Sequence, residues 1–167
     1  AENFDLDRGI DELIRIYGNA ITQAISERPD NMTVTIHMCR GNARSSWLAE
    51  GGYEPVAENM FAGVPVDGFF MEWDTSRAGG FEPLRFAPRD KMIVLGLVSS
   101  KFGELENKDE LKRRIEEAAK YIPLENLCIS PQCGFASTAA GNIISEDDQW
   151  RKLTFLVEVA EEIWGNI

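Results

Sequence analysis

The chain has 167 residues, of which 44% are hydrophobic, and this is enough to build one domain with a sizeable core. Its formal charge of −11 argues against nucleic acid and anionic membranes as partners, because basic surfaces bind phosphate groups. No apolar run approaches the roughly 20 residues that span a bilayer. The three cysteines are widely spaced and odd in number, which does not indicate a disulfide framework and favours a reducing cytoplasm.

The first part of the sequence predicts a helix, a strand and a second helix. Residues 7–27 repeat apolar side chains at near-helical spacing and are expected to form an amphipathic helix. Residues 32–37 follow as a short β-branched run, which is typical of a buried strand. Residues 53–61 predict a short helix that ends at Gly63.

The rest of the sequence alternates strands and helices. Three further strands are expected where the chain has near-continuous apolar runs, at residues 66–73, 92–98 and 124–130. A helix is expected over residues 108–121, because Asn107 and Glu110 have the spacing of a capping box. Ser145 and Asp148 repeat that spacing before the last helix. Near-continuous apolar strands that alternate with helices indicate a parallel sheet covered by helices.

The fold class is therefore α/β. A doubly wound sheet is one solution, but its glycine-rich phosphate-binding turn is missing after the first strand, where residues 40–42 contain a single glycine. A (β/α)8 TIM barrel needs eight strands and typically ~250 residues, so this chain would carry about four of the eight strand–helix units. The outer strands of such a half-barrel would be open edges, and open edges invite pairing with a partner.

Four potential metal ligands lie at the carboxyl ends of the predicted strands, which form the functional face of a parallel barrel. His37 and Cys39 are two residues apart, so their side chains point the same way along a strand. Glu72 lies near the end of the second strand, and Cys133 lies just past the end of the fourth. Cysteine sulfur, histidine nitrogen and carboxylate oxygen are the ligands of tetrahedral zinc. The sequence thus predicts a zinc site that activates a substrate thiol.

Each of these residues also has a purely structural interpretation. A single histidine on a strand is more often a hydrogen-bonded interior residue, and single cysteines are most often small buried hydrophobic residues. Glu72 fits that interpretation less well, because an unpaired carboxylate within an apolar strand is costly to bury. The shared position of the four residues at strand exits favours the metal site.

Weaker candidates follow the strands on the same face. Ser99, Ser100 and Lys101 come after the third strand and are candidate substrate-binding residues, with ordinary loop polarity as the alternative. Asp74 and Thr75 could orient the zinc ligands from behind, or could cap their own loop. We expect no catalytic residues beyond the metal ligands.

Three stretches resemble the metal-ligand segments of the cobalamin-independent methionine synthase family, namely HMC, FFMEWDTSR and CISPQCGFAST. The whole chain, residues 1–167, is similar to the C-terminal half of the catalytic barrel of this family, most closely to its shorter single-barrel relatives. The family pattern of His-x-Cys, a strand-end Glu and a later Cys-Gly matches His37, Cys39, Glu72 and Cys133.

The resemblance implies a zinc-dependent methyltransferase that moves a methyl group from a methyltetrahydrofolate-type donor to the thiol of homocysteine, forming methionine. It implies Zn2+ as the cofactor and a substrate pocket that this chain does not complete. We expect the missing N-terminal half of the barrel, or a second copy of the chain, to cover the open sheet edges. The alternatives are a catalytically inert zinc-binding half-barrel and a corrinoid-linked zinc thiol methyltransferase.

Overall fold

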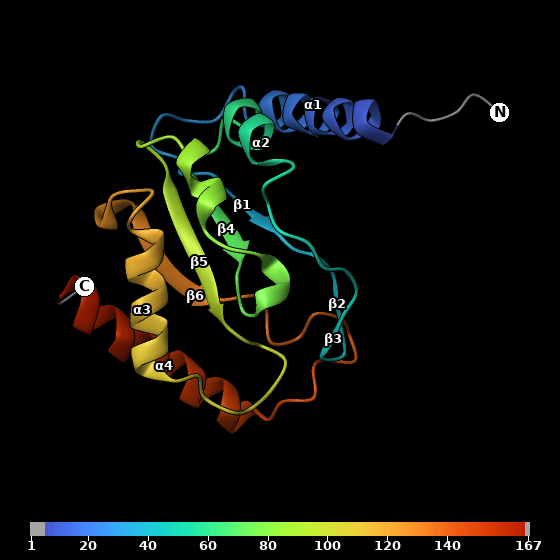
Figure 1. The fold of residues 1–167 in the computed structure, drawn as a ribbon. Coiled ribbons are helices and arrows are strands. Elements are labelled where there is room, and N and C mark those ends of the chain that lie inside the picture. Colours follow the sequence, from blue (N-terminus) through green and yellow to red (C-terminus); the bar gives the residue numbers. More distant parts are fainter. Residues whose placement is uncertain (1–5, 166–167) are drawn as a thin grey trace.

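A computed structural model describes residues 6–165 of the chain (Figure 1). Its helices and strands are, in chain order, α1 (Leu6–Ala24), β1 (Thr35–Met38), β2 (Asn42–Ala43), β3 (Ser46–Trp47), α2 (Ala57–Gly63), β4 (Gly68–Glu72), β5 (Met92–Val98), α3 (Lys108–Ala118), β6 (Leu127–Pro131) and α4 (Glu146–Trp164). None of the helices over residues 6–165 combines the length and the apolar character that a membrane span requires.

The four long strands form one parallel sheet in the order β1-β4-β5-β6. This spatial order follows the chain without a reversal, as in a (β/α) barrel, whereas a doubly wound sheet reverses direction at a switch point. The α/β prediction, with about four strand–helix units of a barrel, is therefore confirmed. The short antiparallel pair of β2 and β3 was not expected.

The hydrophobic core lies between one face of the sheet and the helices. Because side chains alternate along a strand, Phe69 and Met71 on β4 face the same way as Ile93 and Leu95 on β5. These residues are at most 1% exposed and belong to one cluster with residues of α2, α3 and α4. Burying each such side chain contributes about 1.5–3 kcal/mol.

The opposite, concave face of the sheet is only partly covered. Neighbouring strands place one row of side chains on it, formed by His37, Phe70, Val94 and Cys128. Within that row His37 is exposed, and Phe70 and Cys128 are half-buried. In a closed barrel this face points inward and is filled by side chains from all the strands. The helices therefore cover the outer face of the sheet, while the face that would point into a closed barrel stays partly open.

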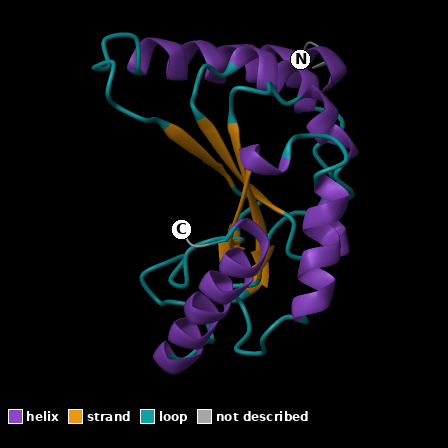
Figure 2. Cartoon of the chain, turned by 90° about the vertical axis from the view of Figure 1, so that its left-hand side faces the viewer, coloured by secondary structure: helices purple, strands orange, loops and turns teal. Residues whose placement is uncertain are grey.

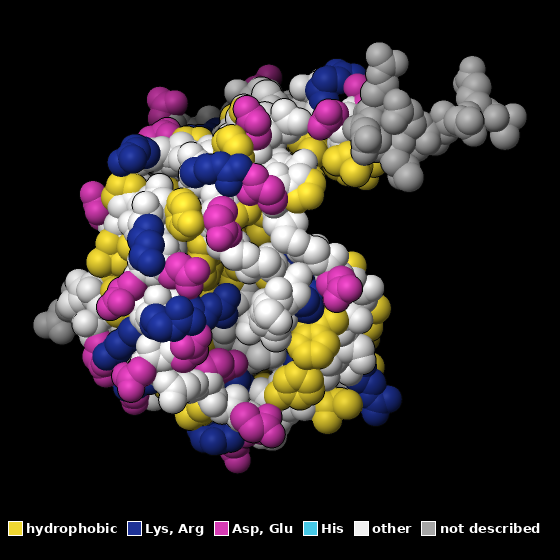
Figure 3. Space-filling model, in the orientation of Figure 1, with side chains coloured by type: hydrophobic (Ala, Val, Ile, Leu, Met, Phe, Trp, Pro, Cys, Tyr) yellow, Lys and Arg dark blue, Asp and Glu magenta, His cyan; other side chains and the backbone are white. Residues whose placement is uncertain are grey.

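Helix α1 lies across one end of the sheet in both ribbon views (Figures 1 and 2). It crosses α2 closely at Gly18, where a Cβ atom would lie 2.7 Å from the Gly63 carbonyl oxygen. Four apolar side chains of α1 are 40–63% exposed, namely Ile10, Leu13, Ile16 and Tyr17. Figure 3 shows hydrophobic side chains along the lower side of α1, beside a notch between this helix and the rest of the molecule.

Several boundaries differ from the sequence predictions for local reasons. The helix expected over residues 53–61 begins only at Ala57, because the segment from Tyr53 forms a turn before it. The strand expected over residues 124–130 begins at Leu127, after a 3-10 turn at Leu124–Asn126 that follows Pro123. Proline fixes its own φ and favours a turn at that point.

The two capping predictions had different outcomes. The Asn107 side chain accepts a hydrogen bond from the Glu110 N–H, as predicted. The Glu110 carboxylate, however, binds Arg113 on the same helix, so only half of this capping box forms. The box of Ser145 and Asp148 is complete and begins α4.

An ion pair ties the segment before β1 to the start of β4. Asp67 accepts hydrogen bonds from Arg28 Nη2 at 2.9 Å and from the Val34 N–H at 2.7 Å. These two donors lower the pKa of the Asp67 carboxyl to about 2. A carboxyl whose pKa falls on folding stabilises the fold at pH values above its ordinary pKa, and this stabilisation is lost as the pH falls towards the folded-state value.

We predict that Asp67→Asn lowers the urea midpoint of unfolding at neutral pH, because the amide cannot replace the charged acceptor. The difference from wild type should shrink as the pH falls from about 4 to about 2, where the wild-type carboxyl is also protonated. Equilibrium urea unfolding followed by circular dichroism measures this. Asp90→Asn, at an exposed position before β5, is the matched control. A difference that persists unchanged at low pH would contradict the ion-pair account.

Candidate metal centre

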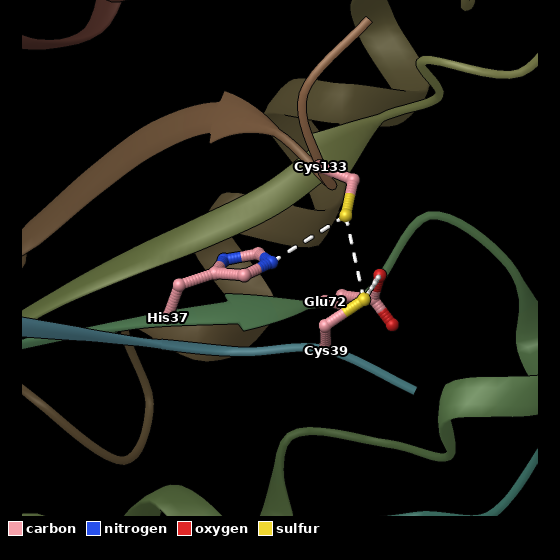
Figure 4. Close-up of side chains that lie close together, drawn as sticks. All are labelled: His37, Cys39, Glu72 and Cys133. Atoms are coloured by element: carbon pink, nitrogen blue, oxygen red, sulfur yellow. Dashed lines mark hydrogen bonds between the residues drawn. The ribbon is translucent and has the colours of Figure 1, made fainter. Parts of the chain in front are cut away.

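The sheet brings the four predicted ligands together at its carboxyl end (Figure 4). His37 lies on β1 and Cys39 directly follows that strand, Glu72 is the last residue of β4, and Cys133 lies two residues past β6. One ligand atom from each residue lies within 4.8 Å of the others. Residues that are nearly a hundred positions apart in sequence thus surround one point.

The spacing of these atoms fits a tetrahedral zinc ion. The Cys39 and Cys133 sulfur atoms are 3.4 Å apart, and Cys133 Sγ is 3.4 Å from His37 Nε2. Cys39 Sγ is 3.6 Å from Glu72 Oε1. Zinc bonds of ~2.3 Å to sulfur and ~2.0–2.2 Å to nitrogen or oxygen give tetrahedral edges of roughly 3.3–3.8 Å. The donor types suit this ion, and these three separations lie within that range.

The two thiols have different surroundings. Burial, together with the hydrogen bond that the Cys133 thiol donates to Cys39 Sγ, raises the pKa of Cys133 to about 12. Cys39 is exposed and accepts a hydrogen bond from the Gly41 N–H at 3.2 Å. A metal ligand must be a thiolate, so metal binding and loss of the Cys133 proton are coupled.

Glu72 is fully buried and both of its carboxylate oxygens have partners. Oε1 accepts a hydrogen bond from Gln132 Nε2 at 2.7 Å. Oε2 accepts one from the Arg40 N–H at 3.1 Å, with the guanidinium groups of Arg40 and Arg77 at 3.5 and 3.6 Å. Both arginine side chains are 10% exposed. A buried carboxylate needs such partners, because an unpaired charge is costly away from water.

Two of the three candidate substrate-binding residues, Ser100 and Lys101, contact Gln132, which in turn contacts Glu72. Ser100 and Lys101 are fully buried, and each donates a hydrogen bond to Gln132 Oε1, at 2.7 and 2.9 Å. Burial lowers the pKa of Lys101, although nearby carboxylates oppose this effect. Ser99 is half-buried, and its N–H donates to Glu106. Their role in substrate binding stays a prediction.

The two residues proposed to support the ligands differ in their contacts. Asp74 accepts hydrogen bonds from Trp47 Nε1 at 3.3 Å and from Arg77 at 3.4 Å, and Arg77 also faces Glu72. Asp74 is thus connected to the ligand set through one arginine. Thr75 directly precedes the 3-10 helix Ser76–Ala78, and its buried Oγ1 has no hydrogen-bond partner within residues 6–165.

Three residues of this site were not identified from the sequence, namely Arg40, Arg77 and Gln132. Arg40 lies on a loop and Arg77 in the short 3-10 helix Ser76–Ala78, and nothing in the sequence distinguishes either from solvated charge. Gln132 immediately precedes Cys133 at a strand exit, and its position was the only available signal.

The sequence pattern of the family described as "Cobalamin-independent synthase, Catalytic domain" matches residues 18–162 of the chain. This range contains all four ligand candidates. The chain belongs to the cobalamin-independent methionine synthase family. The resemblance seen in the ligand segments is thereby confirmed.

Two curated relatives are proteins of Bacillus subtilis (strain 168). YxjG is 57% identical over 155 residues, which cover 92% of this chain and 41% of YxjG. YxjH is 52% identical over 150 residues, which cover 89% of this chain and 40% of YxjH. Neither name states an activity. This chain spans about two fifths of the length of these two relatives.

Two solved structures share the fold. One, from Listeria monocytogenes, is named as a candidate vitamin-B12-independent methionine synthase and is 38% identical, with a TM-score of 0.71 over 99% of this chain and 44% of that one. The other is a B12-independent methionine synthase from Shewanella sp. W3-18-1 in complex with selenomethionine. It is 20% identical, with a TM-score of 0.73 over 93% of this chain and 45% of that one, and at this identity it supports the fold alone.

We predict that the purified chain binds zinc in about equimolar amount under reducing conditions, and that Cys133→Ser loses most of it, because the site then has a single thiolate. Cys128→Ala is the matched control, since Cys128 lies on β6 outside the ligand group and its loss should leave the zinc content unchanged. Metal analysis after gel filtration measures both. Equal zinc in Cys133→Ser and wild type would contradict this ligand assignment.

Proposed function

We propose that this chain supplies the metal centre of a zinc-dependent methyltransferase, which moves a methyl group from a methyltetrahydrofolate-type donor to the thiol of homocysteine and forms methionine. Family membership and the structural neighbours support a methyltransferase role in methionine synthesis. Residues 1–167 would be the C-terminal half of the catalytic barrel. His37, Cys39, Glu72 and Cys133 would hold the zinc.

One observation carries this proposal: two thiols, an imidazole and a carboxylate surround one point at the carboxyl end of the sheet, with their ligand atoms within 4.8 Å of one another. Bound there, zinc would keep a substrate thiol as its thiolate, the form that attacks an activated methyl group. Cys39 and His37 are exposed, so this side of the group is accessible to a substrate.

Glu72 is the ligand best suited to give way to a substrate thiol. Its Oε2 is already paired with Arg40 and Arg77, and its Oε1 is hydrogen-bonded to Gln132. The carboxylate therefore keeps its charge partners whether or not it holds the metal. The thiols and the imidazole have weaker alternative partners, so their release would cost more free energy.

A corrinoid-linked zinc thiol methyltransferase is the nearest alternative, since such enzymes also use a His-x-Cys pair and a later cysteine. The carboxylate of Glu72 within the ligand group favours the synthase. An inert zinc-binding half-barrel is the other alternative, and it differs from the proposal in activity rather than in metal content.

We further propose that a β-strand from the other half of the barrel covers the open edge of β1. A groove of about 590 Å³ lies between α1, β1 and α2, and most of its lining is apolar, including Ile14, Ile21, Ile36 and Met60. β1 is at the edge of the sheet, so its outer backbone groups can pair with an added strand. The relatives are more than twice as long as the matched segment and would supply that strand.

The activity is tested in a chimera in which this chain replaces the matched 155 residues of YxjG, with YxjG itself assayed alongside. We expect the chimera to form methionine from homocysteine and a methyltetrahydrofolate donor, and the chain alone to form none. Cys133→Ser should reduce the chimera to background, whereas Cys128→Ala should keep its rate. Methionine formed only from methylcobalamin would favour the corrinoid alternative, and an unaffected Cys133→Ser would contradict the proposal.

The barrel-completion proposal is tested by co-expressing the chain with the part of YxjG outside the matched residues. We expect a one-to-one complex by light scattering, with slower hydrogen exchange at the β1 amides. Ile14→Asp, which puts a charge into the groove, should weaken the complex, because a buried charge is costly. Asn19→Asp, at an exposed position of α1, is the control. A stable homodimer of the chain that excludes the added fragment would contradict this proposal.

A further inference from the structure

Gln132 is a buried side chain that contacts both a ligand and a buried cation. It is 1% exposed. Its amide nitrogen donates to Glu72 Oε1 at 2.7 Å, and its amide oxygen accepts from Lys101 Nζ at 2.9 Å and from Ser100 Oγ at 2.7 Å. Gly96 leaves room for it, since a Cβ there would lie 2.8 Å from the Gln132 Cα. The Lys101 ammonium Nζ also lies 3.9 Å from Asp74 Oδ2.

The partners of this amide allow one orientation only. An ammonium group has donors and no acceptor, and a carboxylate has acceptors and no donor. If the amide turned over, its NH2 group would meet the ammonium of Lys101, and its oxygen would meet the carboxylate of Glu72. Both contacts would be repulsive, and buried polar groups would lose their partners. Lys101 and Ser100 therefore fix which end of Gln132 faces Glu72.

The fixed amide in turn fixes the ligand. Oε1, which Gln132 holds, is the oxygen 3.6 Å from Cys39 Sγ, while Oε2 is held by the Arg40 N–H on the other side. With each oxygen bound to a different donor, the carboxylate cannot rotate without losing a hydrogen bond. Its Oε1 thus stays on the side of the thiols.

We propose that Gln132, oriented by Lys101 and Ser100, is a positioning residue that holds Glu72 Oε1 towards the metal position. This inference rests on the proposed zinc site and assigns buried Lys101 a role at that site that does not require contact with substrate. Residues that hydrogen-bond to metal ligands set the orientation of those ligands, and their loss typically weakens metal binding about 10–100-fold.

The test is a double-mutant cycle on zinc affinity, measured in the full chain by competition with a chromophoric chelator. Gln132→Met should weaken zinc binding about 10–100-fold in the wild-type background. In the Glu72→Ala background, Gln132→Met should change the zinc affinity by no more than about threefold, because the carboxylate that Gln132 positions is absent. Lys101→Met should show the same pattern with a smaller loss, since Ser100 still orients the amide. Cys128→Ala should leave the affinity unchanged.

Each outcome decides the matter. An equal loss in both backgrounds would mean that Gln132 only supports the fold, and no loss in the wild-type background would mean that Glu72 is positioned without it; either result overturns the inference. If Gln132→Met does not fold, as judged by circular dichroism, the Lys101→Met cycle decides by the same criterion. Absence of zinc binding by the wild-type chain would instead overturn the proposed function, and the inference with it.

Discussion

The carboxylate of Glu72 is fully buried at the end of β4, and the polar groups at this end of the sheet are arranged around it. Removing a carboxylate from water carries an effective penalty of several kcal/mol, which must be offset by charge partners and hydrogen bonds. Arg40, Arg77 and Gln132 supply them from three different segments, and Lys101 fixes the last of these. The same carboxylate belongs to the group of candidate metal ligands. The need to satisfy one buried charge thus links the metal position to loops and strands that lie far apart in the sequence.

The metal position and the substrate pocket depend on different parts of the barrel. Each candidate ligand lies on or just after β1, β4 or β6, and these strands pack against the core on their outer face. The ligand group is therefore built by the strands that the chain contains. The concave face and the outer edge of β1 are open, by contrast, so the walls that would enclose a substrate are not formed by residues 6–165. A half-barrel can thus bring candidate metal ligands together and still leave a substrate site unenclosed.

Much of this arrangement could be predicted from the sequence, because it depends on periodicity and on strand ends. Apolar runs located the strands, and the carboxyl ends of parallel strands located His37 and Glu72. Contacts that depend on tertiary distance could not be predicted. The spacing of Asn107 and Glu110 matched a capping box, but the Glu110 carboxylate accepts a hydrogen bond from Arg113 instead of from the Asn107 N–H. Arg77 reaches Glu72 from the 3-10 helix after β4, and Gln132 reaches it from the end of β6; local sequence patterns do not predict these contacts.

Two cysteines, one histidine and one glutamate of this chain are proposed to form a single zinc site. X-ray absorption spectroscopy at the zinc edge tests it most directly, because the spectrum counts the ligands by element. We expect two sulfur ligands at ~2.3 Å and two nitrogen or oxygen ligands at ~2.0–2.2 Å, with one sulfur remaining in Cys133→Ser. A zinc-loaded chain whose spectrum shows only nitrogen and oxygen ligands would contradict it.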